Sequence, residues 1–303
     1  MDINFEYYKI FYYVAKYRNI TKAAAALGRN QPNITRIMKL LEAQLNCKLF
    51  VREARGVSLT EEGEKLYSHV EIAYKYLLNA EEELRCHETE ETGTVEIGAT
   101  ETALHIFLLD AMKTFKEKYP KIRIKIHNHT TPELVKLLVS GILDFALITT
   151  PFESRKSFQR QELFVFQEIL AGGIQYSHLC NKKIELGSLE TYPWIGLGRG
   201  TATYELYKRF FLEHKVDIEL DMEVATSDLM IPLIQNNLGI GFVPQPVAVP
   251  LLDNKQLVQL ELENQTPMRS IEAVYDKERG KSRAADNFYK YLISWMAEGK
   301  RGL

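Results

Sequence analysis

The chain has 303 residues, more than one ordinary domain, with 46% hydrophobic residues and a net charge of −2 at pH 7. No run approaches the roughly 18 apolar residues of a membrane-spanning helix, and no basic region followed by an apolar stretch predicts a secretory signal. The three cysteines, Cys47, Cys86 and Cys180, are odd in number and widely spaced, which argues against a disulfide framework and suits a reducing cytoplasm.

Charge is unevenly distributed along the chain. Residues 1–58 contain ten Lys and Arg against four Asp and Glu, a net of +6, which leaves −8 for residues 59–303. A basic head on an acidic body is the electrostatic pattern of a DNA-binding module. We therefore expect phosphate contacts near the N-terminus and an affinity that falls steeply with salt.

The strongest local pattern is a pair of helices within residues 20–42. Four alanines at 23–26 favour a helix and let a second helix pack closely. Asn30 is a favoured N-cap of that second helix, and Pro32 falls in its first turn, where a missing N–H costs little. One apolar stripe follows at Ile34, Met38, Leu41 and Leu45. The pattern indicates a helix-turn-helix, and the alternative is an ordinary amphipathic pair with a solvated basic face.

The other side of the second helix carries residue types that read base edges or hold phosphates. They are Gln31, Asn33, Thr35, Arg36 and Lys39. We expect Gln31, Thr35 and Arg36 to face the major groove, with Asn33 and Lys39 nearer phosphates.

Two short apolar runs then flank an Arg-Gly turn at residues 55–56. This predicts a two-stranded wing with Arg52 and Arg55 near its tip, placed to contact phosphates. Thr60 is expected to cap a long helix, with Glu61 and Glu62 in the first turn, where the helix dipole favours acids.

Residues 5–63 resemble the winged helix-turn-helix of the LysR-type transcriptional regulators. The matching pieces are Phe5, Phe11, Val14 and Ala15, then Thr21-Lys22-Ala23-Ala24, Gln31-Pro32, Leu49-Phe50-x-Arg52 and Leu59-Thr60-x-x-Gly63. The resemblance implies a DNA-binding domain over residues 1–60 and adds Thr21 and Lys22 to the candidate DNA contacts. Arg29 departs from the family's small apolar residue and is expected to contact a phosphate. Ile37 and Leu40 replace polar positions, which leaves the base-reading set open.

A linker helix is predicted for residues 61–91. Its apolar residues alternate at spacings of four and three: Leu66, Val70, Ala73, Leu77, Ala80 and Leu84. This heptad-like stripe indicates a helix that pairs with another helix, and it fits the family's dimerising linker. The alternative is a helix packed on its own domain. Gly93 follows an acidic run and is a plausible hinge.

From Thr94 the pattern changes to strands near 95–99, 122–126 and 145–148, with helices at 103–119 and 132–140 between them. This β-α-β-α-β order predicts a mostly parallel sheet with helices on both faces. A second set begins near Glu162, with two strands up to Gly173, helices at about 202–214 and 227–236, and strands near 219–225 and 239–244. Strands at 257–262 and 271–275 and a helix around 284–296 complete the chain.

This part resembles the effector domain of the same family, two α/β lobes with the fold of periplasmic binding proteins. The matching pieces are Gly93-Thr94-Val95-x-Ile97-Gly98 and Asn237-x-Gly239-Ile240-Gly241-Phe242-Val243-Pro244. The whole chain is thus expected to combine an all-α winged helix-turn-helix N-terminal domain, a long linker helix and an α/β effector domain at 92–303. Lobe I would take about 92–161 and 267–303, and lobe II about 162–266.

Threonines recur at the ends of the predicted strands and the starts of the helices, where ligands bind in open α/β sheets. The candidate effector-binding set is Thr100, Glu101, Thr102, His129, Thr130, Thr149, Thr201, Thr203 and Thr226. We expect Thr100, Thr102, Thr130, Thr149 and Thr201 to line one cavity for a small anionic or amide-bearing metabolite. For each threonine, simple N-capping is the alternative.

Other polar residues leave alternatives open. Glu101 would satisfy the helix dipole, pair with a cationic effector or face solvent. His127 and His129 are two residues apart, but no third ligand predicts a metal site. A peroxide-sensing role for Cys180 lacks a partner at sensible spacing.

The sequence therefore predicts a cytoplasmic, sequence-specific DNA-binding transcriptional regulator controlled by a small-molecule effector bound between two lobes. We expect a homo-oligomer, a dimer or by resemblance a dimer of dimers, with double-stranded DNA as partner, RNA polymerase as a possible one, and no membrane. No acid–base pair, nucleophile with its base or phosphate-cradling loop predicts an enzyme, and no cofactor is expected. The alternative is a solute-binding or enzymatic α/β protein with an incidental helical domain.

Overall fold

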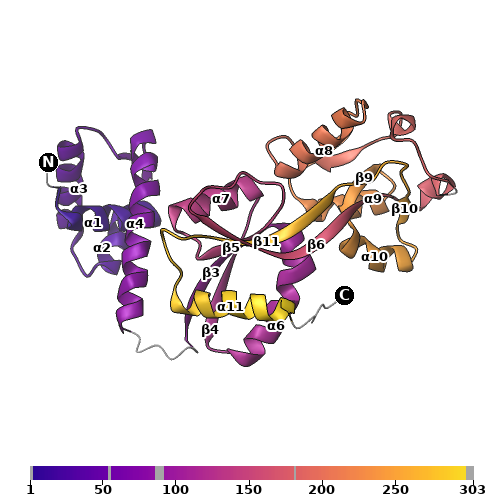
Figure 1. Cartoon of the computed structure of the whole chain (residues 1–303). Helices are drawn as coiled ribbons and strands as arrows, with labels where there is room; N and C mark the ends of the chain where they lie inside the picture. The colour runs from indigo at the N-terminus through magenta and orange to yellow at the C-terminus, as the bar shows by residue number, and fades with distance from the viewer. Residues whose placement is uncertain (1–2, 54–55, 86–91, 181, 298–303) are drawn as a thin grey trace. The chain divides into compact units, whose positions relative to one another are not determined.

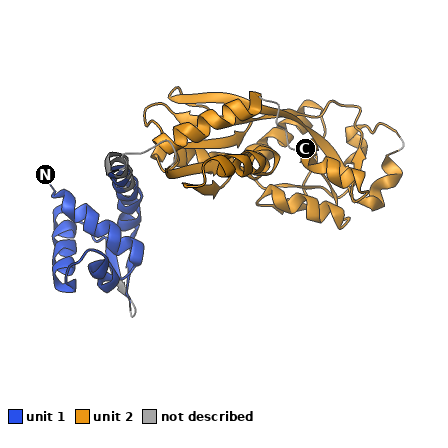
Figure 2. Cartoon of the chain, turned by 90° about the horizontal axis from the view of Figure 1, so that it is seen from below, with its two compact units in different colours: residues 1–87 blue, residues 88–303 orange. Residues whose placement is uncertain are grey.

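The computed structural model describes residues 3–53, 56–85, 92–180 and 182–297, without the side chains of residues 52, 75, 79–80 and 82–85. The chain forms two compact units, residues 1–87 and 88–303 (Figure 1, Figure 2). Among the described residues, no helix is long and apolar enough to cross a membrane.

The described residues of unit 1 form four helices and a two-stranded wing (Figure 1). The elements are α1 (Phe5–Tyr17), α2 (Ile20–Ala26), α3 (Gln31–Leu45), β1 (Phe50–Glu53), β2 (Gly56–Leu59) and α4 (Glu61–Arg85). Asparagines set the helix starts: the side chain of Asn19 accepts from the backbone N–H of Lys22, and that of Asn30 from Asn33, both at 3.0 Å. The predicted cap and the proline in the first turn of α3 are confirmed.

The core of unit 1 lies between α1, α2, α3 and the first half of α4. Ile34, Met38 and Leu41 are buried there and Leu45 packs against them, which confirms the predicted stripe of α3. Ile37 is 4% exposed and belongs to this core, whereas Leu40 is exposed. The buried side chain of Ile37 is therefore not available to contact bases.

The long helix α4 begins as predicted. The hydroxyl of Thr60 accepts from the backbone N–H of Gly63 at 3.0 Å and donates to the carbonyl of Lys48 at 2.6 Å.

The predicted stripe of α4 divides into two parts. Leu66 and Val70 pack into the core of unit 1, so their assignment to a seam with a second helix is wrong. Ala73 and Leu77 are exposed, and the side chains of Ala80 and Leu84 lie outside the described ones. The first turns of α4 thus follow the alternative of a helix packed on its own domain.

Lobe I of unit 2 is a sheet covered on both faces. It contains β3 (Gly93–Ala99), β4 (Ile122–Asn128) and β5 (Phe145–Thr149), which are parallel, and β11 (Met268–Asp276), which is antiparallel to β5. Its helices are α5 (Glu101–Ala103), the π-helical η1 (Leu104–Leu108), α6 (Leu109–Lys118), α7 (Thr131–Ser140) and α11 (Arg283–Ala297).

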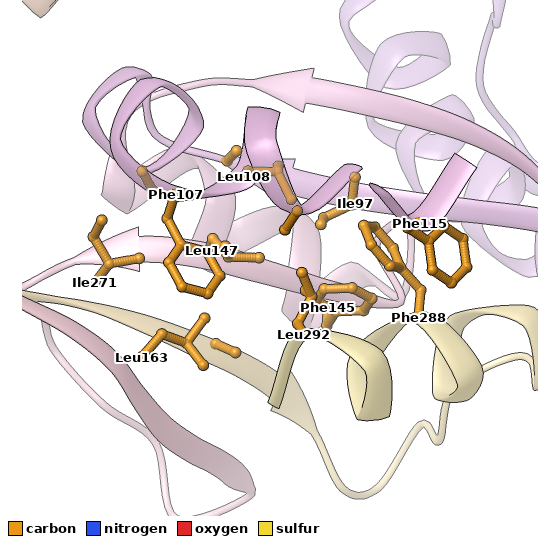
Figure 3. Close-up of a cluster of buried hydrophobic side chains, with 14 of the residues drawn as sticks. Ile97, Phe107, Leu108, Phe115, Phe145, Leu147, Leu163, Ile271, Phe288 and Leu292 are labelled. Atoms are coloured by element: carbon orange, nitrogen blue, oxygen red, sulfur yellow. The ribbon is translucent and has the colours of Figure 1, made fainter. Parts of the chain in front are cut away.

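Successive side chains of a strand point to opposite faces of the sheet, so the core of lobe I forms two layers. Phe145 and Leu147 pack with α6 and α11, where Phe115 and Phe288 meet with ring centroids 4.3 Å apart (Figure 3). The intervening Ala146 and Ile148 pack on α7. Helices on both faces are therefore confirmed.

Lobe II is joined to lobe I by two strands. The 15-residue β6 (Phe158–Gly172) pairs with β11 up to Gln167 and with β9 (Ile240–Pro244) from Glu168 onward (Figure 1). The prediction of two strands here is wrong, because a strand can change partners without a turn. The chain thus passes from lobe I to lobe II near residues 167–168, several residues after the predicted boundary at 161–162.

The rest of lobe II surrounds β6 and β9. Its elements are η2 (Ile174–Leu179), η3 (Leu186–Leu189), β7 (Ile195–Leu197), α8 (Ala202–Glu213), β8 (Met222–Val224), η4 (Ser227–Leu229), α9 (Met230–Gln235), α10 (Gln245–Asp253) and β10 (Val258–Leu260). β7 and β8 form a parallel pair, and β10 extends the sheet beside β6.

Candidate DNA-binding and effector-binding sites

The outward face of α3 is a continuous polar surface. Gln31, Pro32, Thr35, Arg36 and Lys39 line one shallow depression on it. Gln31, Arg36 and Lys39 are exposed. Four of the five predicted polar residues of this helix therefore share one surface, as the 3.6-residue period requires.

Asn33 is the fifth of these residues, and it contacts Arg36 directly. The Arg36 Nη2 donates to the Asn33 Oδ1 at 3.3 Å. Asn33 thus orients the guanidinium of Arg36, one turn further along α3.

The remaining candidate DNA contacts are placed differently. Arg29 Nη2 donates to Glu6 Oε1 at 2.6 Å, so part of its charge is already neutralised within unit 1. Thr21 and Lys22 are exposed at the start of α2. The side chain of Arg52 and the whole of Arg55 lie outside the described residues.

We expect Arg36 to make a bidentate contact with a base edge. Arg36→Ala should then weaken operator binding by about 1–3 kcal/mol and relax preference at one or two base pairs. Fluorescence anisotropy on the operator and on its single-base variants measures both effects. The matched control is Arg29→Ala, which removes the same charge from a residue paired to Glu6 and should cost less affinity without changing base preference. Unchanged preference in Arg36→Ala would show that α3 reads bases with other side chains.

Unit 2 contains an apolar cavity of about 430 Å³. Aromatic side chains form much of its wall: Trp194, Tyr204, Tyr207, Phe211 and Phe242. Three of these come from α8, and the rings of Tyr207 and Phe242 stack with centroids 4.6 Å apart. Residues of lobe I close it, including Glu101, Thr102 and His105. The cavity has the size and the apolar walls of a small-molecule site.

A buried ion pair joins this cavity to the crossing of β6 and β11. Arg269 Nη1 donates to Glu168 Oε1 at 2.8 Å, and the two residues are 4% and 2% exposed. Arg269 also donates to the Thr149 hydroxyl at 3.1 Å and to the Thr150 carbonyl at 2.6 Å. The pair is therefore surrounded by hydrogen bonds that hold three strands together, as a buried pair requires.

Two buried polar oxygens lie at the wall of the cavity, Glu168 Oε2 and the Tyr207 hydroxyl, and both are shielded from solvent. Burial, the negative charge of Glu168 and a hydrogen-bond interaction with the same carboxylate raise the pKa of Tyr207 well above its usual value. The hydroxyl is therefore neutral and able to donate to Glu168.

The predicted threonine-lined cavity is wrong. Only Glu101, Thr102 and Thr203 of the nine candidate residues line the cavity. Thr100 caps α5 and Thr201 caps α8 through backbone N–H groups, at 3.3 and 3.1 Å. These hydroxyls are used by the helices, which is the N-capping alternative.

The other candidates lie elsewhere. Thr130 forms a capping box with Glu133 at the start of α7, and Thr149 is buried against Arg269. Thr226 precedes η4 without lining the cavity. His129 is exposed, with its Nδ1 3.9 Å from Glu133.

Three further polar residues have partners of their own. Glu101 Oε1 lies 2.7 Å from His105 Nε2, one helical turn away at the cavity rim. His127 Nε2 lies 2.7 Å from Glu96. Partial burial raises the pKa of the Cys180 thiol, which opposes the reactive thiolate form of a peroxide sensor.

The residues that build the cavity floor were not predicted from the sequence. Tyr204, Tyr207 and Phe211 recur at helical spacing on α8, a pattern shared by any buried helix face. Glu168 and Arg269 lie within buried stretches of β6 and β11. A charge inside a buried strand is the signal that could have marked them.

Known proteins resemble both units. The family described as LysR substrate binding domain matches residues 88–297, and the bacterial regulatory helix-turn-helix protein, lysR family, matches residues 5–64. The HTH-type transcriptional regulator YofA of Bacillus velezensis is 28% identical over 273 residues, 89% of this chain and 91% of the relative. The RuBisCO operon transcriptional regulator of Allochromatium vinosum is 24% identical over 298 residues, 98% of both chains.

Solved structures show the same fold. Full-length CbnR complexed with its target DNA is similar with a TM-score of 0.72 and 19% identity, over 96% of this chain and 99% of that one. The effector binding domain of QuiR in complex with shikimate is similar with a TM-score of 0.60 and 15% identity, over 68% of this chain and 98% of that one. With both family matches in chain order, this chain belongs to the LysR family and is a DNA-binding transcriptional regulator with an effector-binding domain.

Proposed function

We propose that this regulator is controlled by a small molecule held in the 430 Å³ cavity of unit 2. The observation that carries the proposal is the size of this cavity together with its largely aromatic and apolar wall. The cavity takes residues from both lobes, so a bound molecule would favour one arrangement of the lobes over another.

We propose further that the face of α3 formed by Gln31, Thr35, Arg36 and Lys39 reads the operator, with Asn33, Lys22 and Thr21 beside it. The exposure of Gln31, Arg36 and Lys39 and the capped start of α3 support this. CbnR, which has the same fold, forms a complex with its target DNA, and this is consistent with the proposed role.

The proposal includes action by binding, without catalysis, in the cytoplasm where the DNA is. The buried charges of the cavity, Glu168 and Arg269, are paired with each other and neither is a nucleophile beside a base. Contact with RNA polymerase would be the route by which the bound protein changes transcription.

Salt-dependent binding of the full chain to the DNA upstream of its own gene tests the DNA-binding part. We expect specific binding whose affinity falls steeply between low and physiological salt, as phosphate neutralisation requires. Binding to unrelated DNA with equal affinity at every salt concentration would contradict sequence-specific recognition.

We also propose that α4 pairs with the same helix of a second chain. Beyond the core of unit 1 it exposes three large apolar side chains in succession, Tyr76, Leu77 and Leu78, at 52%, 42% and 38%. Such exposure is typical of an interface. A dimer would present two heads to two half-sites of the operator.

We expect Leu77→Lys to weaken self-association and to cost at least about tenfold in operator affinity, because one head alone loses the advantage of a linked second head. Sedimentation and operator binding measure the two effects. Ser68→Lys is the matched control, because Ser68 is an exposed residue of α4 that lies nine residues before Leu77, about 180° around the helix. If Leu77→Lys sediments as the unchanged oligomer, residue 77 does not lie in the seam.

A further inference from the structure

The cavity of unit 2 is elongated and follows one face of α8. The wall residues on this helix recur at helical spacing: Thr203, Tyr204, Tyr207, Lys208, Phe211 and Leu212. The nine steps between the first and the last of them correspond to about 13 Å, at a rise of 1.5 Å per residue. The cavity therefore extends along nearly the whole of this 12-residue helix.

The opposite long wall is formed by residues 194–197, which include β7. Trp194, at the beginning of this stretch, meets Phe211 near the end of α8, with ring centroids 5.4 Å apart. The Thr201 hydroxyl, at the start of α8, donates at 2.9 Å to the carbonyl of Gly198, directly after β7. The strand and the helix thus run in opposite directions along the cavity, and three steps of strand give about 10 Å of wall.

The two ends of the cavity differ in polarity. At the end near Thr203 the wall residues are polar and come from lobe I and from η4, which lies against α5: Glu101, Thr102, His105, Ser227 and Asp228. At the end near Leu212 the wall residues are apolar apart from the exposed Asp217: Val216, Ile218 and Leu220. A ligand that fills the cavity lengthwise would therefore have a polar group at one end and an apolar body at the other.

We propose that the effector carries an unbranched alkyl tail, which lies along α8 with the polar head of the molecule at the end near lobe I. A volume of about 430 Å³ spread over a length of about 13 Å gives a narrow cross-section, which suits an extended chain better than a compact ring system. The inference rests on the proposed function of this cavity. It replaces the anionic or amide-bearing metabolite expected from the threonine pattern, because only Thr102 and Thr203 of those threonines line the cavity.

A series of straight-chain primary alkanols, from hexan-1-ol to dodecan-1-ol, tests the tail without a charged head. When each alkanol is titrated into the full chain by calorimetry, we expect every added methylene to tighten binding about fourfold, which corresponds to about 0.8 kcal/mol for one buried CH₂. The gain should end at one chain length, where the tail fills the cavity, and longer alkanols should bind no more tightly.

A compact alcohol separates the shape of the ligand from its hydrophobicity. The alcohol 4-tert-butylcyclohexanol has the same number of carbons as decan-1-ol and also carries one hydroxyl. Its ring covers a shorter part of the wall and buries less apolar surface, by the equivalent of about two methylene groups or more. We therefore expect decan-1-ol to bind at least about tenfold more tightly.

Substitutions at the apolar end assign the end point of the series to this cavity. Ile218 is half-buried there, so a change in its size alters the length available to a tail. Ile218→Phe should end the gain at a shorter alkanol and Ile218→Ala at a longer one, while hexan-1-ol binds to both as it does to the parent. Ile174→Phe is the matched control, because Ile174 is an exposed residue of lobe II that does not line the cavity, and it should leave the end point unchanged.

Each result bears on a separate claim. Equal or tighter binding of 4-tert-butylcyclohexanol overturns the alkyl tail and leaves the cavity as the effector site. If no alkanol binds while the operator is still bound, or if neither Ile218 variant moves the end point, both the tail and the site are overturned and the DNA-binding role remains. If Ile218→Phe does not fold, Ile218→Ala decides: an end point equal to that of the parent overturns the proposal.

Discussion

Arg269→Met is expected to lower the stability of unit 2 by about 3–5 kcal/mol. The substitution keeps an apolar chain of similar length but leaves the Glu168 carboxylate, 2% exposed, without its counter-charge. The hydrogen bonds to Thr149 and to the Thr150 carbonyl are lost as well. For a domain of this size the loss corresponds to a fall of roughly 6–20 °C in the Tm of unit 2.

Calorimetric unfolding of the full chain measures this loss, and the transition of unit 1 serves as the internal reference. The matched control is the double variant Glu168→Leu with Arg269→Met, which removes both charges together. It should recover much of the lost stability, because replacing a whole buried pair by apolar groups is often neutral. A single variant as stable as the parent would show that the pair does not need its charge balanced.

Gly63→Ala is expected to destabilise unit 1 by about 3 kcal/mol, at the upper end of the usual cost of overpacking. A Cβ atom at Gly63 would overlap the backbone carbonyl oxygen of Leu49 and would lie 3.0 Å from a methyl carbon of Leu59. The Leu49 carbonyl also accepts the backbone N–H of Thr60 at 3.0 Å. The Leu49 carbonyl is a backbone group fixed by this hydrogen bond, so it cannot move aside as a flexible side chain would.

We expect operator binding to fall with the unfolding of unit 1 in this variant, while the calorimetric unfolding transition of unit 2 is unchanged. Gly28→Ala is the matched control: no atom lies within 4 Å of its Cβ, and only the positive φ of 61° opposes the change, which costs about 1–2 kcal/mol. If Gly63→Ala were the milder of the two, the close approach of Leu49 would not be the reason for a glycine at this position.

Much of the fold could be predicted from local patterns. The caps at Asn30 and Thr60 and the apolar stripe of α3 depend only on neighbours in the sequence, and the structure confirms them. The alternation of strands and helices likewise predicted the lobe I sheet with helices on both faces. The resemblance to the LysR family, carried by motifs of the first 63 residues, is confirmed for both units.

Prediction from the sequence failed where the environment of a residue depends on contacts with segments that are distant in the sequence. Leu66 and Leu77 belong to one helical stripe, yet Leu66 packs into the core of unit 1 and Leu77 is exposed. The difference arises because α1 packs against the first half of α4, as far as Tyr74. The sequence of β6 predicts two strands, but the structure has one continuous strand whose partner changes from β11 to β9 near Gln167. Local dihedral preferences do not specify which strand will pair with it.

The effector site shows the same division between sequence and structure. The sequence by itself determined that threonines would begin helices, because a hydroxyl finds the backbone N–H groups three residues away. Only the tertiary structure decided which side chains share the cavity, since Glu168 and Arg269 are 101 residues apart and meet where two strands cross between the lobes. Burial at that crossing makes the two charges depend on each other, because buried charges are removed from bulk water and must be satisfied by a partner within the protein.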